Sequence, residues 1–209
     1  MASAISMTQS RIHWSAASKP KPGQEACGDL YLVKVVEDAA LLAVVDGLGH
    51  GTEAIIAAQR AVEILEQHAS EPLITLVHRC HEALSRTRGA VMTLAAVQLA
   101  EGTMTWMGVG NVEGWLFRAG THSRRLSERV LLRSGVVGYN LPVLHSAVLP
   151  VAEGDLLLFA TDGIRSGFTE QLKLASPPAD IVKHVLAQDF KGTDDALVLA
   201  VRYLGKAYE

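Results

Sequence analysis

The spacing of apolar residues changes along the chain, and each change predicts a new element. Apolar residues alternate or run together at 11–18, 29–36 and 39–45, which predicts three early strands. From Thr52 the spacing becomes helical, and the expected apolar face consists of Ile55, Ala58, Val62 and Leu65. A second helix is expected from about Pro72 to Arg86, and its apolar stripe consists of Leu73, Val77, Cys80 and Leu84.

Strand patterns return after Gly89. Three strands are expected at 90–100, 102–110 and 112–119, joined by short turns as in a β-meander. A loop-rich stretch at 120–143 is followed by strands at 145–151 and 155–161, a short helix at 178–188 and a closing strand at 196–204. This order lacks the regular strand–helix alternation of a parallel sheet. We therefore expect one α+β domain over 1–209, with two stacked, mainly antiparallel sheets (a β-sandwich) flanked by α-helices in four αββα layers.

Composition and charge narrow the class of protein. The chain has 209 residues, of which 49% are hydrophobic and 20% charged, as in ordinary globular domains. The net charge of −3 gives no electrostatic reason to expect nucleic acid or an anionic membrane as a partner. No apolar run approaches a membrane span, and the N-terminal residues lack a signal-peptide pattern. Only two cysteines occur, so the sequence predicts a cytoplasmic protein without a disulfide framework. A monomer is also expected.

Aspartates stand at the ends of the most apolar predicted strands. They are Asp29 after Gly28, Asp46 before Gly47, Asp162 before Gly163, and the pair Asp194 and Asp195 before the last strand. A single Asp–Gly pair is a common turn, but several unpaired carboxylates at one end of a core would repel one another and resist desolvation. A hard divalent cation removes that cost, and magnesium and manganese prefer carboxylate, carbonyl and water oxygens. The pattern predicts a metal site.

Four segments carry a family resemblance. The motifs "CGD", "VVDGLGHG", "FATDGIRSGF" and "GTDDALVLAV" resemble, in order, the metal-site motifs of the metal-dependent protein phosphatases, the PPM family, and especially its SpoIIE-like branch. The resemblance implies a β-sandwich with two divalent cations, manganese or magnesium. It implies that Asp46 bridges both metals, that Gly47 lends its carbonyl, that Asp162 and Asp194 hold one metal and that Asp29 serves the other. Asp195 falls where many relatives have asparagine, so a supporting role behind the ligands is expected.

The resemblance also implies an activity. The expected reaction is hydrolysis of phosphoserine or phosphothreonine on stress-signalling (stressosome-type) partner proteins by metal-activated water. Leu48 stands where well-studied relatives have a histidine, and His50 is the nearby candidate for a catalytic role. The arginine motif that clamps phosphate in those relatives is not found, and Arg11 fits it poorly. The general acid and the phosphate clamp therefore stay open.

Two other functions fit parts of the sequence. The stretch "DGLGHG" also matches the nucleotide box of histidine-kinase-like ATPases, including anti-sigma-factor kinases. Those proteins need an asparagine-bearing helix upstream, whereas the two asparagines here, Asn111 and Asn140, lie downstream. A non-catalytic module that only binds a phosphoprotein is the other alternative. Finally, the arginine-rich stretch 118–133 is either a solvated loop or a basic docking flap, in which Arg124 and Arg125 are the candidate contacts for substrate.

Overall fold

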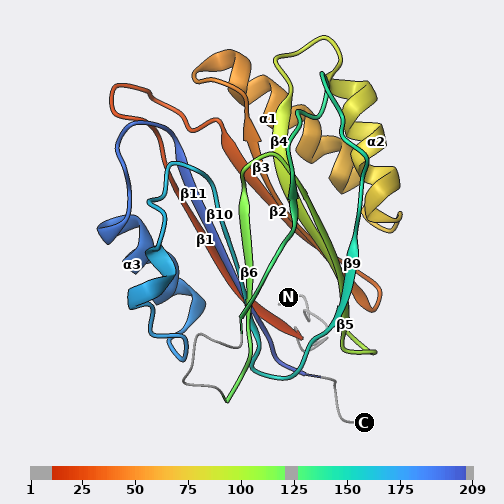
Figure 1. Ribbon diagram of the computed structural model, residues 1–209, viewed down its shortest axis with the longest axis vertical. Coiled ribbons are helices and arrows are strands. Elements are labelled where there is room, and N and C mark those ends of the chain that lie inside the picture. Colours follow the sequence, from red (N-terminus) through yellow and green to blue (C-terminus); the bar gives the residue numbers. More distant parts are fainter. Residues whose placement is uncertain (1–10, 121–126, 206–209) are drawn as a thin grey trace, which may run out of the picture.

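Two sheets stacked face to face form the centre of the molecule (Figure 1). The structure is a computed structural model, and it describes residues 11–120 and 127–205. The five-stranded sheet has the order β1 (Ile12–Lys19), β11 (Ala196–Tyr203), β10 (Leu156–Ala160), β6 (Glu113–Phe117) and β7 (Ser127–Arg129). The six-stranded sheet has the order β2 (Asp29–Val36), β3 (Ala39–Gly47), β4 (Ala90–Gln98), β5 (Thr103–Val109) and β8 (Leu132–Arg133), with β9 (Ala147–Pro150) also paired to β5.

Helices cover both outer faces of this sandwich. Helices α1 (Thr52–Gln67) and α2 (Leu73–Leu84) pack on the six-stranded sheet, and α3 (Pro178–Gln188) packs on the five-stranded sheet (Figure 1). The short 3₁₀ helix η2 (Phe168–Gln171) precedes α3 in the chain. One apolar cluster fills the space between the sheets, and one lies under each helical layer. The predicted αββα architecture is therefore confirmed. Among the described helices, none combines the length and apolarity that crossing a membrane requires.

The buried face of α1 differs in part from the prediction. The residues that are buried are Ala54, Ala57, Ala58, Ala61 and Leu65. Ile55 and Val62, which were expected on this face, are only partly buried. A face of alanines lets the helix axis lie close to the sheet, which a row of larger side chains would prevent. The apolar stripe predicted for α2 is buried as expected.

The predicted β-meander is wrong at its last strand. β5 pairs with β4 in the six-stranded sheet, whereas β6 pairs with β10 in the other sheet. The chain changes sheets at Gly110–Val112, where Gly110 has a φ of 97° and a Cβ would lie 2.2 Å from Cγ1 of Val91. Only glycine fits such a turn. The short strands β7 and β8 were also missed, because two or three partly polar residues carry too little pattern.

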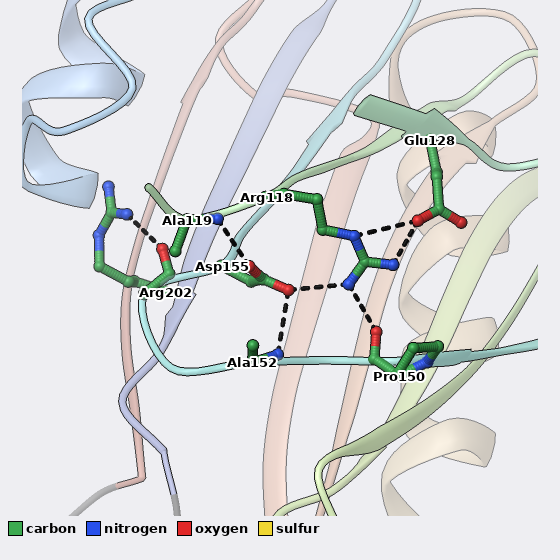
Figure 2. A network of polar contacts seen from close by, with 8 residues as sticks. Arg118, Ala119, Glu128, Pro150, Ala152, Asp155 and Arg202 are labelled. Atoms are coloured by element: carbon green, nitrogen blue, oxygen red, sulfur yellow. Dashed lines mark hydrogen bonds and ion pairs between the residues drawn. The ribbon is translucent and has the colours of Figure 1, made fainter. Parts of the chain in front are cut away.

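A polar network closes the end of the sandwich at which Ile12 of β1 pairs with Tyr203 of β11 (Figure 2). The carboxylate of Asp155 is 1% exposed and accepts hydrogen bonds from the backbone N–H groups of Ala119 (2.7 Å) and Ala152 (3.0 Å). Arg118 donates to Asp155 through Nη1 (2.9 Å) and also forms an ion pair with Glu128. Every oxygen of this buried aspartate therefore has a donor from the protein itself.

Candidate metal centre

The predicted aspartates meet at the other end of the sandwich. Asp29 and Asp46 are direct partners in the register of β2 and β3. In the facing sheet, Asp162 follows β10 and Asp194 precedes β11, and these two strands are antiparallel neighbours. A hydrogen bond joins the two sheets here, because Thr161 Oγ1 donates to Asp29 Oδ2 at 2.7 Å. The topology thus gathers residues from four strand ends into one place.

Asp195 is held entirely by backbone groups. Its Oδ1 accepts a hydrogen bond from the N–H of Lys21 and its Oδ2 from the N–H of Gly28, both at 2.7 Å. The side chain is buried. Because both oxygens are already engaged, this arrangement favours the predicted supporting role, in which Asp195 fixes the loop that leads into Asp29, over direct metal ligation.

Asp46 has a different environment from Asp155 or Asp195. Its carboxylate accepts no hydrogen bond from any residue that the structure describes, and it is partly buried beside the other aspartates. Burial, followed by the charges of Asp29, Asp162 and Asp194, raises the pKa of Asp46 well above its ordinary value. Burial also raises the pKa of Asp29, against the lowering effect of its bond from Thr161. Both shifts show that negative charge is costly here without a counter-charge.

A cavity of about 420 Å³ opens beside these carboxylates. Its lining residues are Asp46, Leu48, Gly49, Val91, Gly110, Asn111, Ser134, Val136, Asp162 and Asp194. Within the described ranges, no three His, Cys, Asp or Glu side chains already enclose a common point as metal ligands. Magnesium and manganese bind through a few carboxylates and keep several waters, so an open cavity walled by carboxylates fits such ions. The donor set, in which Asp46 accepts no hydrogen bond from the described residues, fits a hard divalent cation.

Two functional candidates escaped the sequence analysis. Asn111, in the turn between β5 and β6, donates from Nδ2 to Oδ2 of Asp162 at 2.8 Å. Lys191 donates from Nζ to the backbone carbonyl of Asp162 at 2.5 Å. Asn111 was overlooked because the predicted meander put its turn within one sheet. The change of sheets is what brings it to the cavity.

We expect Asn111→Ala to raise the dissociation constant for manganese about tenfold or more, because the partner that orients Asp162 is lost. Isothermal titration calorimetry with MnCl₂ measures this directly, without relying on turnover. Asn140→Ala is the matched control, since Asn140 is exposed and does not line the cavity. Equal manganese affinity in wild type and Asn111→Ala would show that Asp162 needs no such partner.

Two glycines of the motifs are required by packing. A Cβ on Gly47 would lie 2.0 Å from the backbone oxygen of Ala54 in α1. A Cβ on Gly163 would lie 1.9 Å from the backbone oxygen of Asp195. Gly49 and Gly51 adopt φ values of 94° and 76°, as expected for residues that turn a strand into a helix. Close backbone approach thus explains Gly47 without a metal, and its carbonyl ligation stays a prediction.

Gly163→Ala is expected to lower the free energy of unfolding by about 1–3 kcal/mol, because the added methyl group collides with backbone that has to move. Urea denaturation followed by circular dichroism measures the change. The exposed Ser166 is close in sequence, and Ser166→Ala serves as the control with little expected effect. Unchanged stability of Gly163→Ala would mean that the two loops can separate freely.

The remaining predicted residues have varied placements. His50 is exposed and does not line the cavity, so its catalytic role stays a prediction. Cys27 was not predicted as a site residue, and burial, reinforced by the charge of Asp29, raises the pKa of its thiol to about 12, which disfavours a thiolate nucleophile beside the aspartates. Arg124 and Arg125 lie outside the described residues. Of their neighbours, Arg118 belongs to the network in Figure 2, and Arg129 pairs with Glu113 and lies over the ring of Trp115.

The fold and the carboxylate-lined cavity define the class of metal-dependent Ser/Thr protein phosphatases, the PPM family. Within that class, the chain belongs to the SpoIIE family: the family model described as "Stage II sporulation protein E (SpoIIE)" matches residues 37–204. The match includes Asp46, Asp162 and Asp194, and Asp29 lies just before it.

Individual proteins support this assignment. The chain is 32% identical over 92 residues to the phosphoserine phosphatase RsbX of Bacillus subtilis (strain 168), over 44% of this chain and 46% of RsbX. The match thus spans about half the length of that curated relative. A chain from a structure described as the bacterial stressosome, a modular system adapted to control secondary messenger signalling, is 32% identical with a TM-score of 0.83, over 91% of this chain and 99% of that one.

More distant structures share the fold. RsbX in complex with magnesium has a TM-score of 0.81 at 23% identity, over 91% of this chain and 94% of that one. The catalytic domain of the serine threonine protein phosphatase PstP, in complex with two manganese ions, has a TM-score of 0.69 at 17% identity, over 92% of this chain and 98% of that one. At these identities the likeness shows the αββα fold alone. The histidine-kinase-like alternative is therefore wrong, because the segments before Asp46 are strands of a phosphatase fold.

Proposed function

We propose that this protein is a manganese- or magnesium-dependent phosphatase that hydrolyses phosphoserine or phosphothreonine on partner proteins of a bacterial stress-signalling complex. The observation that carries the proposal is Asp46. Its carboxylate lies beside other aspartates at an open cavity and has no hydrogen-bond donor among the described residues. A protein that keeps such an uncompensated cluster has a use for a cation. A non-catalytic binding module has no such need.

The proposed roles follow from what each side chain already contacts. Asp46, whose two oxygens accept no hydrogen bond from the described residues, would be shared between the two cations. Asp162 and Asp194 would hold one of them, and Asp29, whose Oδ2 accepts a hydrogen bond from Thr161, would serve the other through its second oxygen or through water. The Gly47 carbonyl completes the predicted set.

Bound divalent cations supply Lewis acidity toward the phosphoryl oxygens and lower the pKa of water for in-line attack. The protein side chains keep the carboxylates oriented: Asn111 fixes Asp162, and Thr161 fixes Asp29. Lys191 donates to the backbone carbonyl of Asp162 and places a positive charge beside this residue, where a phosphate dianion would gain from it. The leaving serine or threonine oxygen needs a proton, and the structure assigns no general acid for it.

The partner class rests on similarity. RsbX is named a phosphoserine phosphatase, and a chain from the stressosome structure is also 32% identical to this chain. These names support a phosphorylated component of a stress-signalling complex as substrate. We propose that one domain, acting as a cytoplasmic monomer, performs this reaction.

The proposed function is tested with wild-type protein, an aryl phosphate and a phosphoserine peptide, in MnCl₂ and in EDTA. We expect release of inorganic phosphate from both substrates with manganese and loss of the activity in EDTA, restored by added metal. Activity that persists in EDTA would contradict the metal mechanism. ATP turnover without phosphatase activity would contradict the function itself.

A further inference from the structure

A second cavity adjoins the one beside the carboxylates. It measures about 390 Å³, and its lining residues are Leu132, Arg133, Ser134, Pro142, Val143 and His145. Ser134 lines both cavities. The second cavity therefore lies within reach of residues adjacent to a phosphorylated side chain that enters the first cavity.

Arg133 has an unusual position in this second cavity. Its Nε is buried and has no hydrogen-bond partner among the described residues. By contrast, Arg118 and Arg129 each form an ion pair with a carboxylate. Arg133 as a whole is only partly buried and lines the cavity, and no described carboxylate pairs with it. A carboxylate brought by another molecule would therefore meet a guanidinium group that has no competing ion pair among the described residues.

The backbone of Arg133 lies next to the cavity beside the carboxylates, here called the metal-side cavity, which Asp46, Asp162 and Asp194 help to line. Arg133 pairs with Val109 in the parallel register of β8 and β5, and its carbonyl accepts a hydrogen bond from the N–H of Gly110 at 2.8 Å. Gly110 and Asn111 line the metal-side cavity. The backbone of Arg133 is therefore hydrogen-bonded to the same turn that orients Asp162.

The charge and surface of the second cavity indicate what it binds. Its lining contains one arginine and one histidine and no aspartate or glutamate. The surrounding loop also exposes large apolar side chains, with Tyr139 85%, Val143 78% and Leu131 62% exposed. A basic cavity with an apolar rim suits a protein segment that carries one negative charge, because guanidinium groups pair closely with carboxylates. A single arginine suits one carboxylate better than a second phosphate dianion.

We propose that this cavity is a specificity subsite, in which Arg133 binds a glutamate or aspartate close in sequence to the phosphoserine or phosphothreonine of the substrate protein. The proposal rests on the proposed function and extends it from the reaction to the choice of substrate. Arg133 acts here as a specificity residue and takes no part in phosphoryl transfer.

The test compares phosphoserine peptides that each carry one glutamate at a different position near the phosphoserine with a reference peptide that has alanine at those positions. For wild type, we expect kcat/KM for the best glutamate peptide to exceed that of the reference about tenfold, mostly through KM. In Arg133→Met this preference falls to about one, and Arg133→Lys keeps part of it, while aryl phosphate hydrolysis is unchanged. Arg60→Met, at an exposed position of α1, keeps the full preference.

Several results would overturn the proposal. These are no preference for any glutamate peptide in wild type, a preference that survives in Arg133→Met, or an equal loss of activity on peptides and on aryl phosphate. If wild type hydrolyses none of the substrates, the proposed function fails on its own. The subsite is then judged by fluorescence anisotropy with labelled peptides, which requires the same loss of preference in Arg133→Met.

A folding defect in Arg133→Met does not remove the test. His145 is exposed at the same cavity, and His145→Gln leaves β8 untouched. We expect His145→Gln to weaken the preference for glutamate, because it removes the other basic side chain that lines this cavity. If this variant keeps the wild-type preference while Arg133→Met and Arg133→Lys both fail to fold, the proposal is rejected.

Discussion

Asp46→Asn is expected to lower the manganese-dependent hydrolysis of a phosphoserine peptide by about a thousandfold or more. Asparagine has nearly the same shape but no charge, so it leaves the fold intact and removes the central ligand that the proposed mechanism requires. Initial rates at saturating MnCl₂ measure the effect, and calorimetry shows whether metal binding falls with it.

Asp38→Asn is the matched control for this substitution. Asp38 lies at the opposite end of the same β2–β3 hairpin, and its side chain is 71% exposed. Its replacement should leave the rate within about twofold of wild type, as usual for surface changes. An Asp46→Asn protein that retains wild-type activity would refute the placement of the metals, even if the protein is a phosphatase.

The metal-free protein is expected to lose stability as pH rises, and Asp46→Asn is expected to lose less. In the metal-free fold, burial first and neighbouring carboxylates second raise the pKa of Asp46 to about 9. A carboxyl group whose pKa is higher in the folded than in the unfolded state gives stability that is fully present below about pH 4, the ordinary carboxylate value. That stability is lost as pH rises through the folded-state value. Thermal melts in EDTA between about pH 4 and pH 9 measure the loss of stability.

The comparison of wild type with Asp46→Asn shows how much of the pH dependence comes from the aspartate cluster. Asparagine cannot ionise, so Asp46→Asn should melt about 2–4 °C above wild type at the alkaline end for each kcal/mol of repulsion that is relieved. Manganese should raise the melting temperature of wild type most strongly at alkaline pH, because it supplies the missing positive charge. Parallel melting curves for the two proteins in EDTA would show that the carboxylates do not repel one another appreciably.

The sequence was most informative about the aspartates of the candidate metal centre. Aspartates at the ends of apolar strands were found because a charge beside a buried run is conspicuous, and antiparallel topology then brought Asp29 together with Asp46 and Asp162 close to Asp194. The order of strands and helices excluded a parallel sheet and predicted two stacked sheets with helices outside, and the motif resemblance implied the same β-sandwich.

The rest of the site depends on contacts between residues distant in sequence. Asn111 occupies an ordinary-looking Gly–Asn turn, and only the change of sheets after β5 places it on Asp162. Ser134 and Val136 line the cavity from a stretch that reads as a loop. The alanine face of α1 was misplaced for a related reason. Alanine contributes weakly to hydrophobic periodicity, although it decides how closely a helix can approach a sheet.

The pairing of Ile12 with Tyr203 has a practical consequence for experiments with partner proteins. It puts the first and last described strands side by side, at the end of the sandwich remote from the carboxylates. An affinity handle or fluorescent label attached near Ile12 or Tyr203 therefore lies far from the cavities around Asp46 and Arg133. Immobilised protein would then present its catalytic end to a large assembly in solution.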